Sequence, residues 1–169
     1  MGNVVEAMKF LEQAEHIVNE VVRKLKEHPD LLYSGFLTNA LSEFAEAKIL
    51  FSLIQNNDVP TFEELGIPPV PYLQGLGDVV GELRRRAIEC LGMWRIDEAE
   101  KILKIMESIF RNLSSLDYPE ALIPGIRHKA DVARRLVEDL RTMITEIKTR
   151  KVLIDRIDSL KSLLTSRNR

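Results

Sequence analysis

The sequence lacks the features that define several large classes of protein. Its 169 residues include one cysteine, Cys90, so a disulfide within the chain is excluded, and in a helical pattern we expect Cys90 to be a buried thiol rather than a nucleophile. No apolar run approaches the roughly 20 residues that cross a bilayer, and residues 1–11 lack the apolar core of a signal peptide. We therefore expect a protein of the reducing cytoplasm with no membrane segment.

A strong excess of charge of either sign is also absent. The net charge is −2, with 45% hydrophobic and 30% charged residues, which is typical of a globular protein. Such a chain has no bulk attraction for a polyanion, so any binding of nucleic acid depends on local clusters of Arg and Lys. The length fits one domain that spans residues 1–169.

Apolar residues recur at the spacing of one helix face along most of the chain, and no alternating strand pattern occurs. A first helix is expected over residues 4–25. The last helical region is expected to start near Pro124 and to be broken at residues 149–151. We predict an all-α fold, an antiparallel bundle of about six helices. Asp30 is the expected N-cap of a second helix, whose apolar stripe is Phe36, Ala40, Phe44, Ala47, Phe51 and Ile54.

Turn signals predict how the middle helices begin and end. A proline-rich connector follows the second helix, and a third helix is expected from about residue 72 to residue 91. Thr61 and Glu64 are expected to cap a brief helical turn in the connector. Gly92 is expected to end the third helix in a left-handed conformation. Asp97 and Glu100 form an approximate capping box that is expected to start a fourth helix.

Two pairs of carboxylates stand out within these helices. Glu43 and Glu46 are three residues apart and therefore neighbours on one face, and no Lys or Arg lies three or four residues from either. Their sequence neighbours are apolar, so we expect both acids beside the core. Asp78 and Glu82 are four residues apart, a spacing at which like charges disfavour a helix. If the two helices face each other, the four carboxylates converge.

Such a cluster requires cations or protons, because like charges ~4 Å apart repel by about 4 kcal/mol at an effective dielectric constant near 20. Oxygen ligands favour Mg²⁺, Mn²⁺ or Ca²⁺ over zinc. A solvated acidic face is the alternative, since the chain has 26 acidic residues and Arg85 and Arg86 lie within reach of Glu82 on its own helix. Spacing alone leaves both interpretations open.

Two segments resemble a known family. Residues 40–47, Ala-Leu-Ser-Glu-Phe-Ala-Glu-Ala, and residues 72–85, Tyr-Leu-Gln-Gly-Leu-Gly-Asp-Val-Val-Gly-Glu-Leu-Arg-Arg, are similar to the two signature helices of the translin family. Residues 92–110 and 126–138 resemble the family in order and spacing. The closest branch is that of translin-associated factor X, because noncatalytic translin subunits lack the paired glutamates found here at positions 43 and 46.

The resemblance implies a Mg²⁺-dependent endoribonuclease that acts on single-stranded RNA, with single-stranded DNA as a second candidate ligand. It also implies a homo-oligomer, an octameric barrel whose acidic sites face an internal cavity. One metal ion would activate water and another would stabilise the leaving oxygen. By motif match, the catalytic and metal-binding residues are Glu43, Glu46, Asp78 and Glu82.

The same match gives candidate RNA-binding residues. Arg84 and Arg85 correspond to arginines of the family, and with Arg86 they are expected to contact phosphates. Ion pairing of this basic run with Glu82 and Glu89 is the alternative.

Two other functions remain open from the sequence. One is an RNA-binding translin-like oligomer without turnover. The other is an all-α nucleoside triphosphate pyrophosphatase, which also binds Mg²⁺ through Glu-x-x-Glu and a second acidic pair, although that pair is spaced by three rather than four.

Trp94 is expected as a hydrophobic plug in a helix-to-helix turn rather than a base-stacking residue. The three histidines, His16, His28 and His128, are expected to be surface or capping residues.

Overall fold

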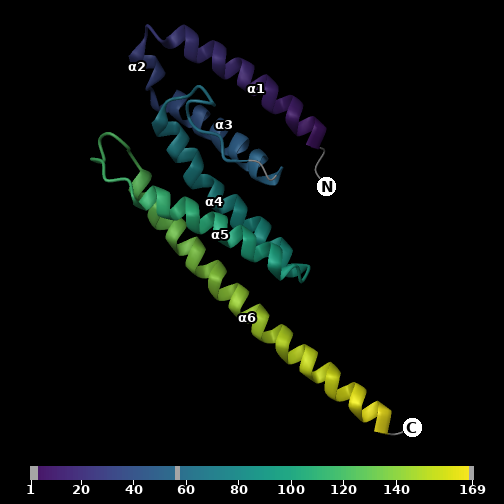
Figure 1. Ribbon diagram of the computed structural model, residues 1–169. Coiled ribbons are helices and arrows are strands. Elements are labelled where there is room, and N and C mark those ends of the chain that lie inside the picture. Colours follow the sequence, from purple (N-terminus) through teal and green to yellow (C-terminus); the bar gives the residue numbers. More distant parts are fainter. Residues whose placement is uncertain (1–3, 56–57, 168–169) are drawn as a thin grey trace.

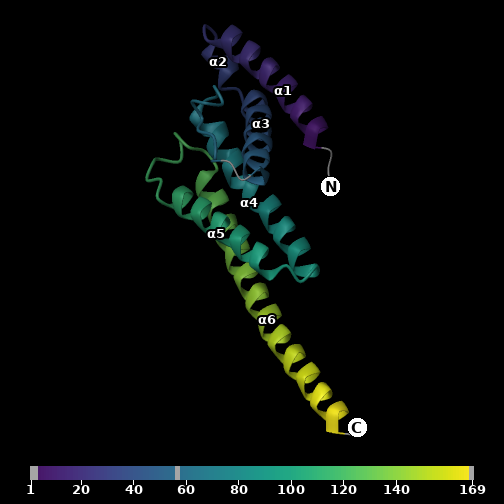
Figure 2. The same cartoon turned by 45° about the vertical axis from the view of Figure 1, so that its right-hand side comes forward.

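The computed structural model describes residues 4–55 and 58–167, and within these ranges the chain contains helices and no strand. The helices form a layered bundle from which the C-terminal part of the last helix extends alone (Figures 1 and 2). The predicted all-α bundle of about six helices is confirmed. In order, the described helices are α1 (Val4–Leu25), α2 (Pro29–Leu32), α3 (Gly35–Ile54), α4 (Pro69–Gly92), α5 (Ile96–Ser114) and α6 (Ile126–Arg167).

Helix α1 has the bounds that its periodicity predicts and lies against α3. Its Val18 and Val22 pack on the core, and Glu15 forms an ion pair with Lys48 of α3 at 2.9 Å. Other residues of α1 leave large apolar side chains in solvent, among them Phe10 at 63% exposure. No helix in the described part of the chain is long and apolar enough to cross a membrane.

The start of α3 differs from the sequence prediction. Asp30 lies inside the short helix α2, which begins at a proline, and so it does not cap α3. Ser34 is the cap instead: its hydroxyl oxygen accepts a hydrogen bond from the backbone N–H of Leu37 at 3.4 Å. The sequence places both residues within reach of the helix start, and the proline decides between them because it opens a separate helical turn.

The buried face of α3 is also rotated from the predicted stripe. Phe44 is buried as expected, but Phe36 is 87% exposed, while Leu41 and Ile49 are almost fully buried. Ala40 and Ala47 of the predicted stripe are exposed as well. Apolar residues occur around most of this helix, so its sequence permits more than one stripe, and the packing against α4 selects among them.

Helices α3 and α4 run in the same direction, which departs from the predicted antiparallel arrangement, and they approach very closely. Residue Gly75 of α4 lies against Ala45 and Glu46 of α3: a methyl group on Gly75 would lie 2.9 Å from the Ala45 Cβ and 2.9 Å from the Glu46 backbone nitrogen. Farther along both helices, Leu53 and Leu83 line one groove. The connector after α3 returns the chain to the end of the bundle where α3 began, so α4 can run alongside it (Figure 1).

The connector is itself ordered at Thr61 and Glu64, which cap each other. The Thr61 backbone N–H donates to the Glu64 carboxylate at 2.7 Å, and the Glu64 backbone N–H donates to the Thr61 hydroxyl at 3.3 Å. The predicted reciprocal cap is confirmed.

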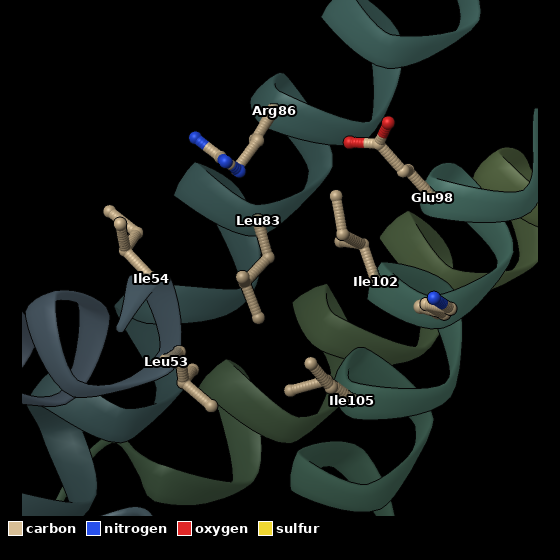
Figure 3. Close-up of a pocket in the computed structure, with 8 residues that line it drawn as sticks. Leu53, Ile54, Leu83, Arg86, Glu98, Ile102 and Ile105 are labelled. Atoms are coloured by element: carbon tan, nitrogen blue, oxygen red, sulfur yellow. The ribbon is translucent and has the colours of Figure 1, made fainter. Parts of the chain in front are cut away.

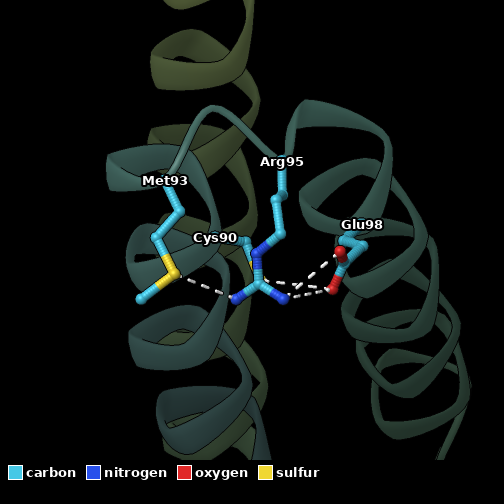
Figure 4. A network of polar contacts seen from close by, with 4 residues as sticks. All are labelled: Cys90, Met93, Arg95 and Glu98. Carbon is cyan, nitrogen blue, oxygen red and sulfur yellow. Dashed lines mark hydrogen bonds and ion pairs between the residues drawn. The ribbon is translucent and has the colours of Figure 1, made fainter.

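The turn between α4 and α5 is built differently from the prediction. Trp94, at φ 60°, takes the left-handed position assigned to Gly92, and it is 52% exposed, so it is not a hydrophobic plug. Arg95 closes the turn by binding the Glu98 carboxylate at 3.0 Å and the Met93 sulfur at 3.3 Å (Figure 4).

The capping box predicted for α5 is wrong. The helix begins at Ile96 without a side-chain cap, and Glu100 pairs with Lys148 of α6 instead. Asp97 contributes its charge to the first turn of α5, where it interacts favourably with the helix dipole.

Helix α6 is continuous through residues 149–151, so the break predicted there is wrong, and Pro124 precedes the helix rather than lying in its first turn. The first half of α6 supplies buried residues such as Ala133, Leu140 and Ile144. From residue 148 to residue 163 every side chain is exposed. Figures 1 and 2 show this second half leaving the bundle without a neighbouring helix.

Candidate metal and RNA site

Four acidic side chains lie on the adjoining faces of α3 and α4. Glu43 and Glu46 come from α3, one turn apart, and Asp78 and Glu82 come from α4, also one turn apart. The contact at Gly75 places Glu46 directly against α4, one turn before Asp78. The two helices run the same way, so both pairs lie at the same level of the bundle.

Three of the carboxylates act electrostatically on the fourth, Glu46. The pKa of Glu46 is raised above its usual value, first by burial and then by the negative charges of Asp78, Glu43 and Glu82. Glu46 is half-buried, whereas Glu43 is exposed. The expectation that both glutamates border the core therefore holds only for Glu46.

Two cations lie among these acids. Asp78 forms an ion pair with Lys129 of α6, and Glu82 binds Arg85 on its own helix at 2.5 Å. The positive charge of Lys129 also lowers the pKa of Glu46, against the effect of the neighbouring acids. The intrahelical ion pair that the sequence offered as an alternative for Glu82 is thus present in the structure.

The donor atoms suit a hard divalent cation, because all four candidate ligands are carboxylates. Within residues 4–55 and 58–167, however, no three His, Cys, Asp or Glu side chains are placed to hold one metal ion together. Asp78 and Glu82 instead direct oxygen atoms at Lys129 and Arg85. The chemistry of the donor set fits a metal ion, provided that these two carboxylates exchange their present partners for it.

The basic run that follows Glu82 divides between two environments. Arg85 is exposed and engaged with Glu82, while Arg84 is half-buried and its Nε is buried without a hydrogen-bond partner in the described part of the chain. Arg86 stands with Glu98 at the edge of a groove whose floor is apolar (Figure 3). The other lining residues are the apolar Leu53, Ile54, Leu83, Ile102 and Ile105, together with Lys101.

The Translin family profile matches residues 3–151, which is most of the chain. The chain belongs to the translin family. A curated member of similar sequence is an uncharacterized protein from Methanocaldococcus jannaschii, 33% identical over 145 residues. That match covers 80% of this chain and 65% of the relative, so the chain spans about two-thirds of the length of that protein.

Solved structures agree with the translin fold. AfC3PO superposes with a TM-score of 0.79 at 32% identity, covering 89% of this chain and 78% of that one, both alone and in its complex with duplex RNA. The apo form of NeC3PO superposes with a TM-score of 0.75 at 27% identity, covering 86% and 76% of the two chains.

Sequence reasoning did not find every residue that contacts the acidic cluster of this translin-family chain. Lys129 lies 51 positions after Asp78, so no local pattern connects them. The sequence marks Gly75 and Gly77 only as part of a motif, although Gly75 permits the approach of α3, and Gly77 lies under Lys129. Cys90 is buried, and the three histidines are exposed, as the sequence predicts.

Proposed function

We propose that this member of the translin family is a metal-dependent endoribonuclease of the branch of translin-associated factor X, acting on single-stranded RNA. The observation that carries the proposal is Glu46, a half-buried carboxylate on which three further carboxylates act from two helices. Concentrating negative charge on a partly desolvated group costs free energy, and a bound divalent cation offsets that cost.

Glu43, Glu46, Asp78 and Glu82 would hold the cation, Mg²⁺ or, in its place, Mn²⁺ or Ca²⁺. When bound, such an ion supplies a water nucleophile at neutral pH and stabilises charge on the phosphate oxygens. The protein keeps the acids in position through the close contact of α3 and α4 at Gly75.

RNA binding is supported by the basic run next to these acids. Arg85 and Arg86 are exposed, and Arg86 stands at the edge of a groove, whereas the Nε of Arg84 is buried and is not itself accessible to a phosphate. Arginine contacts to phosphate position a nucleic acid without reading its sequence. AfC3PO, which shares 32% of its residues with this chain, has been solved with duplex RNA, so RNA is the polymer to test first and single-stranded DNA the second.

A homo-oligomer, with the octameric barrel as the expected form, is part of the proposal. Large apolar side chains are exposed on α1 and on the isolated half of α6, including Phe10, Leu153 and Leu160, each at least 60% exposed. Leu153, Ile157 and Leu160 recur at helical spacing on one face of α6, and an exposed apolar face of this kind marks an interaction surface.

RNA binding without turnover is the second candidate function. It is favoured by the present arrangement of the acids, in which no three of the described side chains are placed to hold a metal ion. In that case the four carboxylates and their cation partners serve to join α3, α4 and α6.

The test is cleavage of end-labelled RNA by the purified protein, with Mg²⁺ or with chelator, on matched single-stranded and duplex substrates. We expect fragments from the single strand that require Mg²⁺ and disappear in Glu46→Gln. Glu12→Gln, which removes an exposed acid of α1, is the control and is expected to cleave normally. A mobility shift with intact RNA would establish the binding function instead.

A further inference from the structure

Lys129 reaches the acidic site from a third helix. It lies in the first turn of α6, where its side chain is 26% exposed, and it pairs with Asp78, whose side chain is 40% exposed. The pair is therefore partly shielded from water, and its attraction is screened less than that of a surface pair.

The backbone of α4 is shaped to receive this lysine. Residue 77 is glycine, and a Cβ there would lie 2.8 Å from the Cδ and 3.0 Å from the Cβ of Lys129. The aliphatic stem of Lys129 thus lies directly on the Gly77 backbone and carries the ammonium group to Asp78. Any side chain at position 77 would push the stem away from the acids.

We propose that Lys129 is the resident counterion of the carboxylate cluster, and that a divalent cation must displace its ammonium group from Asp78 in order to bind. The inference rests on the metal site of the proposed function and adds a determinant of its affinity. It accounts for the present state of Asp78, one carboxylate oxygen of which is bound to a lysine. In this arrangement the lysine stabilises the metal-free protein and weakens metal binding.

Calorimetric titration of the metal-free protein with Mn²⁺ alone tests the inference without relying on activity. We expect Lys129→Met to lower the Kd for Mn²⁺ by about tenfold or more, because Asp78 becomes free to bind and the cluster gains one net negative charge. Lys148→Met is the matched control, since Lys148 also reaches from α6 to an acid on another helix, Glu100, away from this cluster. Its Kd is expected to equal that of the unaltered protein.

Gly77→Ala provides a second variant that retains the charge of the lysine and moves its stem. It is expected to lower the Kd for Mn²⁺ in the same direction by a smaller factor. In chelator, Lys129→Met is expected to melt at a lower temperature than the unaltered protein and to gain more from added Mn²⁺, which separates the loss of a counterion from general damage to the fold.

The outcomes distinguish this inference from the proposed function. Binding of Mn²⁺ to the unaltered protein, with no tightening in Lys129→Met or Gly77→Ala, would overturn the counterion role and leave the metal site standing. Unchanged Mn²⁺ affinity with weakened RNA binding would likewise overturn it and assign Lys129 to the RNA. No Mn²⁺ binding by any of the proteins would overturn both.

Discussion

At the scale of single residues, the main feature of the acidic cluster is a partly buried carboxylate surrounded by other negative charges. Glu46 is half-buried, and Asp78, Glu43 and Glu82 all act on it. A group in this position is not optimised for the stability of the metal-free fold, because both burial and its neighbours oppose its ionisation. Such perturbed groups are concentrated at functional sites.

The pH dependence of Glu46→Gln follows from this shift. The pKa of Glu46 is raised above the ordinary 4.5, so the folded protein binds a proton more tightly than the unfolded chain does. The stability that Glu46 contributes to the folded protein is therefore present below about pH 4.5 and is lost as the pH rises through the raised pKa. In chelator at pH 8 we expect Glu46→Gln to be more stable than the unaltered protein by less than about 1 kcal/mol. For a chain of this size, that corresponds to a melting temperature higher by at most roughly 2–4 °C.

The difference is expected to shrink as the pH falls below 4.5, because Glu46 then becomes protonated in the unfolded chain as well as in the folded protein. Thermal melts at several pH values measure it, with the exposed Glu12→Gln as the control for loss of a negative charge. A melting temperature for Glu46→Gln below that of the unaltered protein at pH 8 would contradict the electrostatic account.

At the scale of helices, the contact of α3 with α4 decides whether the acids meet. The helices approach at Gly75, where a side chain would overlap the Ser42 carbonyl oxygen and crowd Ala45. A methyl group on Gly81, two turns later on the same helix, would have nothing within 4 Å. The two glycines therefore provide a matched pair in which only one is needed for packing.

We expect Gly75→Ala to destabilise the fold by about 1–3 kcal/mol, the usual cost of overpacking, and to separate Glu46 from Asp78. Gly81→Ala is expected to stabilise the fold by about 0.5–1 kcal/mol, because alanine loses less backbone entropy in a helix than glycine does. Urea unfolding followed by circular dichroism measures both. Equal effects of the two substitutions would show that the close approach at Gly75 is not required.

At the scale of the whole molecule, the part of α6 beyond Lys151 extends from the bundle without a neighbouring helix in the described part of the chain. Its side chains are exposed from residue 148 to residue 163, and Leu153, Ile157 and Leu160 recur at spacings of four and three with exposures of 60%, 42% and 61%. This spacing is that of a helix face that packs on another helix. The proposed homo-oligomer would cover it.

Leu160→Glu is therefore expected to reduce the assembled mass measured by light scattering, because a charge on this face would be buried against a partner. Ser162→Glu introduces the same charge on the opposite side of α6 and is expected to leave the mass unchanged. An unchanged mass in Leu160→Glu would show that subunits meet elsewhere, and the exposed apolar side of α1 would be the next surface to test.

Much of the fold is predictable from local patterns. The period of the apolar residues predicts an all-helical chain and the bounds of α1, and the pair Thr61 and Glu64 predicts its own reciprocal cap. The errors arise where two local solutions have similar energies. Asp30 and Ser34 can both cap a helix, Gly92 and Trp94 stand two residues apart in one turn, and α3 has apolar residues on several sides.

The sequence by itself determined the all-helical character of the chain, the family motifs and the spacing of each acidic pair, because all of these depend on residues within a few turns of one another. Only the tertiary structure decided the relation between the pairs: α3 and α4 run in the same direction, Gly75 sets their approach, and Lys129 arrives at Asp78 from α6. Helix direction and register depend on the path of the connector and on which helix faces pack together. Both involve residues far apart in the sequence, so the local spacing of apolar residues does not predict them.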